Sequence, residues 1–140
     1  MADQTSPANA VMAVAASALR AQQSRMRVIA ENMANADSVA KTPGGDPYRR
    51  QIPVFTPSIQ PGGLPGVSMS AVAPDSTAFK IQYQPGHPAA NAKGYVKTSN
   101  VDPLIEALDM KDAQRAYSAN ISVIETARAM DSATLQLLKQ

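Results

Sequence analysis

Glycine and proline are confined to the middle of this 140-residue chain. All seven glycines and nine of the eleven prolines lie between Lys41 and Thr98. Because both residue types interrupt helices, the two flanks are free to be helical and the middle is not. The sequence therefore predicts three parts: an N-terminal helix within 1–40, a Pro/Gly-rich β insert with a stiff strap within 41–99, and a C-terminal helix within 100–140.

The N-terminal helix is predicted to begin with Ser6 as its N-cap and Pro7 at its first helical position, where a missing N–H costs nothing. Beyond this cap, mostly apolar residues recur at alternating spacings of three and four. They form an unbroken heptad seam, which predicts that this helix packs against another helix. The seam comprises Met12, Ala15, Leu19, Gln22, Met26, Ile29, Met33 and Ala36.

The C-terminal helix is predicted to begin in the same way, with Asp102 followed by Pro103. Its apolar stripe is two residues wide, which is broad enough to contact more than one neighbour. Asn120 interrupts the stripe, and the sequence leaves open whether this amide is a buried register determinant or faces solvent. The stripe comprises Met110, Ala113, Ala116, Tyr117, Val123, Ile124, Ala127, Met130, Leu137 and Leu138.

Two helices of this length are too long for a compact domain of this size. About 30 residues at 1.5 Å each give roughly 45 Å per helix, whereas a compact chain of this length is expected to extend about 30 Å. A two-helix hairpin covers only one side of each stripe, and an alanine-rich seam buries little area per residue. We therefore predict that the terminal helices are largely disordered in an isolated subunit and become ordered on assembly.

The middle of the chain is predicted to be extended. Tyr48–Ile59 is rich in β-branched and aromatic residues but contains two prolines, which confine it to an edge strand or a short ribbon. Residues 66–73 and 78–84 alternate with the two-residue period of a strand, and a further strand is expected near 94–97. These segments predict one or two small β-hairpins, with a turn-rich tip between the first two strands.

Composition excludes several classes of function. The chain has no cysteine, so it has no disulfide framework, thiolate nucleophile or sulfur-rich zinc site. Its formal charge is only +2 and its basic residues are scattered, so we expect no nucleic-acid partner. The apolar run Ala10–Leu19 is too short to span a membrane and lacks the preceding positive charges of a signal peptide. We expect no direct membrane insertion and no cleaved signal peptide.

The single histidine, His87, lies between Gly86 and Pro88 in a loop. General acid–base catalysis needs a second titrating group within reach, and a metal site needs several ligands together. His87 has no neighbouring acid, histidine or cysteine in the sequence, so we interpret it as a structural loop residue. The sequence predicts no catalytic residue, no metal site and no cofactor.

A second polar cluster, containing Asn32, Asn35 and Asp37, lies where the N-terminal helix is expected to end. One interpretation is a helix end that frays into a turn, because asparagine tolerates left-handed backbone geometry. The other is a binding role, in which the amides donate to and accept from a neighbouring backbone. The residues themselves leave both interpretations open.

Three motifs together resemble the axial family of bacterial flagellar rod and hook proteins, and within it the short proximal rod proteins. The helix of residues 18–36 ends in the Asn-hydrophobic-Ala-Asn signature Asn32–Asn35, and a turn rich in Gly, Pro, Tyr and Arg follows it. The segment "YQPGHPAANAKGYVKTSNVD" of residues 83–102 and the helix of residues 107–138 are similar to the corresponding segments of the same family. The resemblance covers nearly the whole chain.

The resemblance implies a non-enzymatic structural subunit that polymerises helically with itself and with other rod proteins. The implied fold is mainly α with a small β insert, its two long terminal helices forming an antiparallel coiled-coil-like hairpin. The family leaves the cell through the flagellar type III export apparatus and forms the rod within the periplasm. The "YQPGHPAANAKGYV" stretch would join the β element to the second helix as a stiff strap.

Residues on both helices are candidates for the subunit interface that such an assembly needs. A coiled-coil adaptor or chaperone-like module remains an alternative because it would share the helices, but it should form a small closed oligomer. An enzyme would need a convergent polar site. The candidate interface residues are Leu19, Met26, Ile29, Asn32, Met33, Asn35, Tyr117, Asn120, Ile124 and Leu138.

Overall fold

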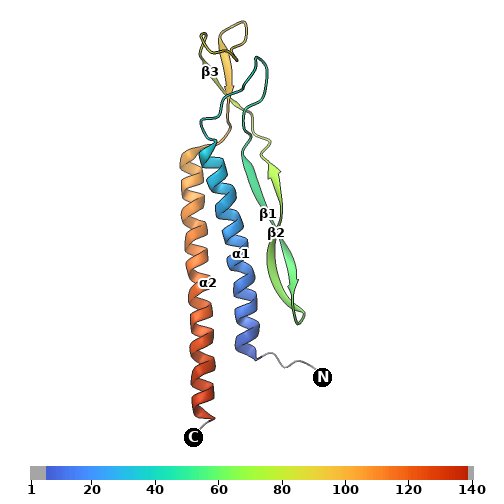
Figure 1. Cartoon of the computed structure of the whole chain (residues 1–140), viewed down its shortest axis with the longest axis vertical. Helices are drawn as coiled ribbons and strands as arrows, with labels where there is room; N and C mark the ends of the chain where they lie inside the picture. The colour runs from blue at the N-terminus through green and yellow to red at the C-terminus, as the bar shows by residue number, and fades with distance from the viewer. Residues whose placement is uncertain (1–5, 139–140) are drawn as a thin grey trace. The chain divides into compact units, whose positions relative to one another are not determined.

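The computed structural model describes residues 6–138 and contains two long helices with four strands between them in the sequence (Figure 1). This arrangement confirms a mainly α chain with a small β insert. The strands form two separate two-stranded sheets, β1–β2 and β3–β4. In chain order the elements are α1 (Pro7–Ala34), β1 (Gln51–Gln60), β2 (Leu64–Pro74), β3 (Lys80–Tyr83), β4 (Tyr95–Thr98) and α2 (Pro103–Leu137).

Both predicted helix starts are confirmed. The Ser6 hydroxyl accepts a hydrogen bond from the backbone N–H of Asn9 at 3.2 Å. The Asp102 carboxylate accepts one from the N–H of Leu104 at 3.0 Å. Each side chain satisfies a backbone donor that the first turn of a helix leaves free, and each is followed by proline at the first helical position.

The predicted ribbon with a turn at its tip is also confirmed, as β1 and β2. Their connection is only three residues long, and Gly62 and Gly63 adopt φ values of +85° and +76° there. Such left-handed geometry is open to glycine without a steric penalty. A Cβ atom at either glycine would meet nothing within 4 Å, so the two glycines themselves turn in open space.

The second sheet corrects one expectation. The "YQPGHPAANAKGYV" stretch does not lead from the β region into α2, because most of it forms the loop between β3 and β4. These strands are antiparallel, with Tyr83 opposite Tyr95, and the two rings meet edge to face at 5.2 Å. Gly94 closes the loop with φ +82°, where a Cβ would lie 2.8 Å from the Tyr83 ring. The sequence suggested a strap because Pro85 and Pro88 restrict the backbone, but prolines also suit a rigid hairpin loop.

The chain divides into two compact units. Unit 1 contains residues 1–26, 54–71 and 112–140, and unit 2 contains residues 27–53 and 72–111. In unit 1 the two helices run antiparallel, because Pro7 shares a groove with Met130 while Gln23 donates to the Tyr117 hydroxyl at 3.5 Å.

A close contact joins the β1–β2 ribbon to α1 within unit 1. The buried Ser17 hydroxyl donates to the Val14 carbonyl at 2.7 Å and accepts from the Val67 N–H at 3.2 Å. Gly66 permits this approach, because a Cβ there would lie 2.8 Å from both Ser17 Oγ and the Gln60 side chain. Helix α1 therefore buries a second face, at Ser17 and Ala21, beside the heptad seam, within which Ala15 and Ile29 are buried and Met33 is exposed.

Unit 2 has a small apolar core beneath the β3–β4 hairpin. Ala40, Ala89 and Val96 are buried together there. An isolated bridge between Val39 and Thr98 extends the hydrogen bonding from β4 to the segment that follows α1. This core is too small to account for the order of unit 2 by apolar burial alone, so its polar contacts matter.

Candidate functional site

Asn32 is the centre of a buried hydrogen-bond network in unit 2. Its side chain is only 1% exposed. Its Nδ2 donates to the Gln51 carbonyl at 2.8 Å and to Glu106 Oε2 at 3.0 Å. Its Oδ1 accepts from the Gln51 N–H at 2.9 Å and from the Tyr48 hydroxyl at 3.0 Å. The amide therefore uses both donors and both acceptor sites, as a fully satisfied buried amide should.

Glu106 is the charged partner of this amide and is 0% exposed. Its Oε1 accepts a hydrogen bond from Arg50 Nε at 2.6 Å. A carboxylate removed from water is costly unless an opposite charge and hydrogen-bond donors pair with it. Glu106 obtains the charge from Arg50 and the second donor from Asn32.

Arg50 also binds two further carboxylates. Its Nη1 lies 3.3 Å from Asp75 and its Nη2 lies 3.2 Å from Asp109. Burial alone would lower the pKa of Arg50, but hydrogen bonding and attraction from Glu106 and Asp75 outweigh burial and raise that pKa. The guanidinium therefore acts as a fixed cation that joins α2 to the ends of the β1–β2 ribbon.

Two other groups at this site have shifted pKa values. Hydrogen bonds from the Thr77 hydroxyl and backbone N–H, followed by those from Arg50, lower the pKa of Asp75 although burial opposes them. Burial raises the pKa of Tyr48, and the negative charges of Glu31 and Glu106 raise it further. Tyr48 therefore remains a neutral donor to Asn32.

A second amide completes the site. Asn100 Oδ1 accepts from the Arg50 N–H at 2.7 Å, and Asn100 Nδ2 donates to the Thr77 carbonyl at 3.1 Å. The Asp75 N–H donates to the Arg50 carbonyl at 2.8 Å. Both backbone groups of Arg50 are therefore paired, and its side chain is directed to the three carboxylates.

We call this set of residues the polar junction: Asn32, Tyr48, Arg50, Asp75, Asn100, Glu106 and Asp109. Its members come from the end of α1, the segment around the start of β1, the end of β2, and the start of α2. The charged side chains of the junction pair with one another, so their arrangement is suited to holding these chain segments together. Such a network fixes how the four chain segments meet, because moving one of them would leave a buried donor or acceptor without a hydrogen bond, which costs free energy.

The structure gives the predicted interface residues different environments. Asn32 and Ile29 are buried inside the subunit, and Asn35 bonds the Glu31 carbonyl of its own helix at 2.8 Å. Asn120 donates to the Ala116 carbonyl one turn earlier, at 2.8 Å. Met33 and Leu138 are exposed, while the remaining predicted residues are half-buried: Leu19, Met26, Tyr117, Asn120 and Ile124. A contact of these residues with another subunit remains a prediction.

Sequence reasoning singled out Asn32 but missed the charged residues around it. Glu106 lies one helical turn before Met110 on the same stripe as Ala113 and Tyr117. An acidic residue in line with an apolar stripe is a signal of a buried, paired carboxylate. Extending the stripe by one turn towards the helix start would have identified Glu106, but nothing local to Arg50 indicates its partner.

His87 lies outside the polar junction, in the β3–β4 loop. Its Nδ1 accepts a hydrogen bond from the Ala89 N–H at 3.0 Å, and its own N–H donates to the Gln84 carbonyl at 3.0 Å. Both hydrogen bonds join residues of the same loop and hold its conformation. They agree with the structural role expected for His87.

Comparison with known proteins shows the family of this chain. A model described as Flagella basal body rod protein matches residues 12–40, and a model of the flagellar basal body rod FlgEFG protein C-terminal region matches residues 92–137. The FlgC flagellar basal-body rod protein of Agrobacterium fabrum is 41% identical over 95% of this chain and 96% of its own length. This chain belongs to the FlgC family. The FlgC proteins of Escherichia coli O6:H1 and Salmonella typhimurium are each 44% identical over 89% of this chain and 92% of their own.

The polar junction joins the two segments that match the family models. Asn32 lies in the first matched segment, and Asn100 and Glu106 lie in the second. The family matches and the FlgC relatives confirm the resemblance to rod proteins that the sequence indicated. Within residues 6–138, neither helix has the length and hydropathy that a membrane span requires.

Proposed function

We propose that this chain is a structural subunit of the flagellar basal-body rod, polymerising helically to form part of the drive shaft and of the export channel wall. The observation that carries the proposal is the similarity to FlgC rod proteins over 95% of this chain and 96% of a relative's length. We infer a non-enzymatic role.

The distribution of apolar side chains supports assembly. Large hydrophobic residues remain exposed on both helices, and contiguous exposed apolar surface is typical of interaction sites. Open helical polymers need heterologous contacts, in which one face of a subunit meets a different face of the next. Exposed members on the two helices include Val11, Val14, Met33, Leu104, Leu108, Ile121, Val123, Met130, Leu135 and Leu137.

In the assembled rod, the two helices would form a coiled-coil-like hairpin, with α2 nearer the channel and the β insert on the outside. The division into 1–40, 41–99 and 100–140 describes this assembled subunit. Leu19, Met26, Tyr117 and Ile124 would bury their remaining surface against neighbours. Partners would be further copies and other rod proteins, and the chain would reach the periplasm through the type III export apparatus without cleavage.

The decisive experiment is mass spectrometry of hook-basal bodies purified from the source cells, with the amount of this chain compared between the rod fraction and the soluble extract. Strong enrichment in the rod fraction is expected. A chain that is abundant in the soluble extract and absent from basal bodies would contradict the proposal and favour a coiled-coil adaptor.

A substitution tests the helix interface directly. Ile124→Asp places a charge in the stripe of α2, and a buried unpaired charge is strongly unfavourable. We expect a soluble chain that fails to enter basal bodies and cells that do not swim. Gln114→Asp adds the same charge at an exposed position of the same helix and should swim normally. Normal motility of the Ile124 variant would count against this interface.

A further inference from the structure

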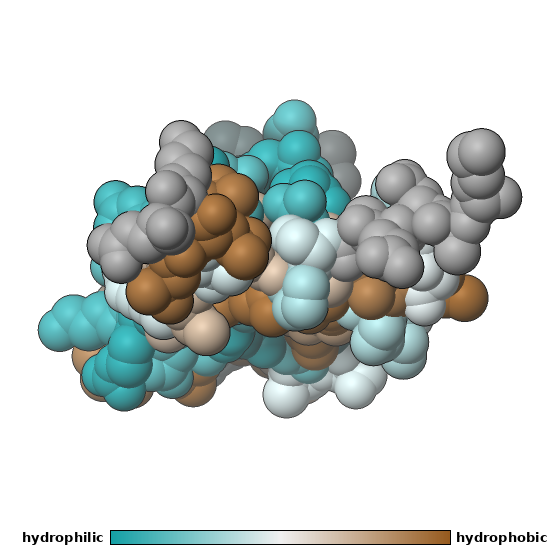
Figure 2. All heavy atoms as spheres, turned by 90° about the horizontal axis from the view of Figure 1, so that it is seen from below, coloured by the Kyte–Doolittle hydropathy of each residue, from teal (hydrophilic) through white to brown (hydrophobic). Residues whose placement is uncertain are grey.

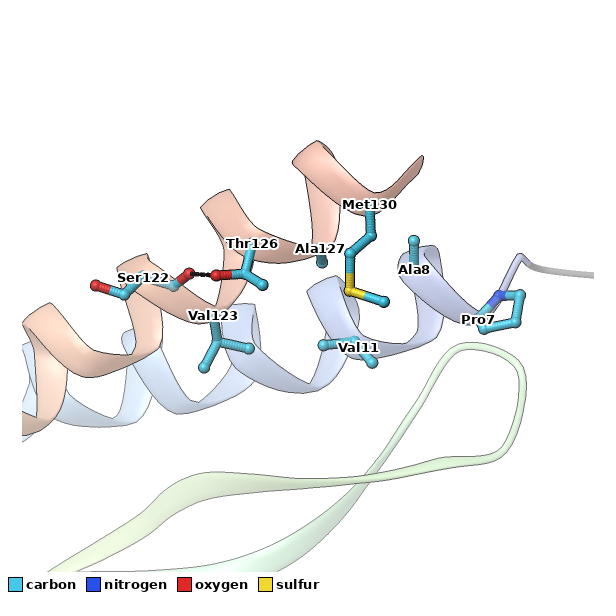
Figure 3. Close-up of a pocket in the computed structure, with 8 residues that line it drawn as sticks. All are labelled: Pro7, Ala8, Val11, Ser122, Val123, Thr126, Ala127 and Met130. Carbon is cyan, nitrogen blue, oxygen red and sulfur yellow. Dashed lines mark hydrogen bonds between the residues drawn. The ribbon is translucent and has the colours of Figure 1, made fainter. Parts of the chain in front are cut away.

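An apolar groove lies between the two helices within unit 1 (Figure 3). It has a volume of about 360 Å³, and the side chains of Val11, Val123 and Met130 converge on it. A second hollow of about 390 Å³ shares Val11 and Val123 and reaches Leu64 and Pro65 beside the turn of the β1–β2 ribbon. We call the two together the helix groove.

The helix groove is lined mostly by apolar side chains, and its polar members are Asn120, Ser122 and Thr126. Thr126 directs its hydroxyl to the Ser122 carbonyl at 2.8 Å, so this polar group is already paired. Residues 7–19 of α1 contain no charged side chain. Seen from below, apolar atoms reach the surface at this end of the helices between polar ones (Figure 2). At about 30 Å³ per molecule, the first hollow alone would hold roughly a dozen waters against walls that offer them few partners.

An apolar ridge lies within unit 2, on the first two turns of α2. Leu104 is 70% exposed, Leu108 is 57% exposed and Ile105 is 50% exposed. Leu104 and Leu108 are four residues apart and therefore lie one above the other on the helix surface. Between them in the sequence, Glu106 is fixed by the polar junction, so the ridge is held on a rigid part of the helix.

We propose that the ridge Leu104–Ile105–Leu108 of one copy occupies the helix groove of a second copy. This inference rests on the proposed rod function and specifies which two surfaces meet. Along α1 the groove runs from Pro7 to Ala15, about 12 Å at 1.5 Å per residue, and the ridge needs about 6 Å. A helix with apolar anchors four residues apart in an apolar groove is a recurring mode of recognition.

Charge and symmetry favour the same pairing. Lys111 follows the ridge by one turn, and Asp131 adjoins Met130 at the edge of the groove. Opposite charges beside two apolar surfaces fix their register. Ridge and groove are different surfaces of one chain. Where the partner does not return the same contact, the pairing is heterologous, and repeating it builds an open filament when the rotation does not close into a ring.

The area of the contact explains why it acts only in a polymer. Stable pairwise interfaces bury about 800 Å² on each partner, and three side chains of a ridge contribute only part of that area. An isolated pair is therefore weak, and the contact becomes effective when each subunit holds several neighbours at once. The contact thus acts as an anchor within a larger interface.

The absence of cysteine from the sequence allows a direct test by disulfide mapping. Cells without the native gene would produce two tagged chains, one with Leu108→Cys and the other with Val11→Cys, and their basal bodies would be isolated and oxidised. A disulfide forms only where two Cα atoms approach within about 7 Å. We expect a cross-linked heterodimer at least tenfold above that of the control combination Gln114→Cys with Val11→Cys.

Further combinations make the result decisive. Leu104→Cys with Val14→Cys should cross-link as well, because Leu104 is the ridge end away from Lys111 and Val14 lies at the groove end away from Asp131. Cross-linking of Leu137→Cys with Val11→Cys in place of Leu108 would assign the groove to the α2 tail of another copy, and a Leu108–Leu108 product would indicate an isologous contact. Either of these results overturns the proposed contact while the rod function stands. The same holds if the substituted chains enter basal bodies and neither expected pair cross-links. Absence of the unsubstituted chain from basal bodies overturns both.

Discussion

Replacing Glu106 with glutamine tests whether the polar junction stabilises unit 2. Both carboxylate oxygens accept hydrogen bonds, one from Arg50 and one from Asn32. A glutamine side chain has only one oxygen, so it leaves one of these donors without a partner. Rotation of the Asn32 amide cannot repair the loss, because its Oδ1 already accepts from Gln51 and Tyr48.

The expected destabilisation follows from these contacts. A buried donor without a partner costs about 1–3 kcal/mol, and replacing a charge-assisted bond with a neutral one costs about 1 kcal/mol more. Relief of the desolvation of Glu106 offsets part of this cost, and Arg50 keeps Asp75 and Asp109 as partners. We expect Glu106→Gln to lower the free energy of unfolding by about 2 kcal/mol.

Urea unfolding followed by circular dichroism measures this loss. With a slope near 2 kcal/mol per molar urea, the midpoint should fall by about 1 M. Faster amide exchange of the Gln51 N–H would locate the effect, because Asn32 accepts that hydrogen. Glu125→Gln is the matched control, since Glu125 is exposed on the same helix. If both variants unfold within about 0.5 kcal/mol of the parent, the junction does not stabilise the unit.

Three further outcomes are expected. Gly66→Ala should cost about 1–3 kcal/mol by forcing the ribbon away from α1 in the ordered subunit, and should therefore lower the amount of chain in purified basal bodies. Gly86→Ala, where a Cβ meets nothing, should be incorporated normally. Because the pKa of Asp75 is lowered in the folded state, its contribution to stability is present above about pH 4 and is lost as the pH falls below that value. The free energy of unfolding of the Asp75→Asn variant should therefore depend less on pH than that of the parent chain, over roughly pH 2 to 4. An unchanged pH profile would refute this. In a verified monomer, hydrogen exchange should be fast along the helical segments of unit 1 and slow around the polar junction, and uniform protection of both helices would refute the predicted folding on assembly.

Local sequence signals predicted the helix starts and the ribbon well, because these features depend on interactions between residues close together in the sequence. Ser6 and Asp102, each followed by proline, located both helix starts. The prolines of β1 correctly indicated a ribbon and not a central strand. The sequence also indicated Asn32 at the end of the N-terminal helix, but its contacts could not be derived from the resemblance.

The parts that the sequence did not predict depend on distant partners. Arg50 and Glu106 are 56 residues apart, and no local pattern states that one neutralises the other. The second buried face of α1 arises from Ser17 and Gly66, a serine that looks like an ordinary helix residue and a glycine that looks like an ordinary turn. The β3–β4 loop was misplaced because proline and glycine indicate rigidity without indicating which elements they connect.

The free tip of the β1–β2 ribbon has a consequence for how such chains can change in size. Gly62 and Gly63 turn the chain in open space, because a Cβ built at either position would meet nothing within 4 Å. Residues inserted there would lengthen the ribbon or enlarge its tip while the Ser17 contact and the polar junction remain intact, since loop closure costs grow slowly with length. The tip is therefore the natural point at which this architecture can accept a new domain, a peptide tag or an epitope.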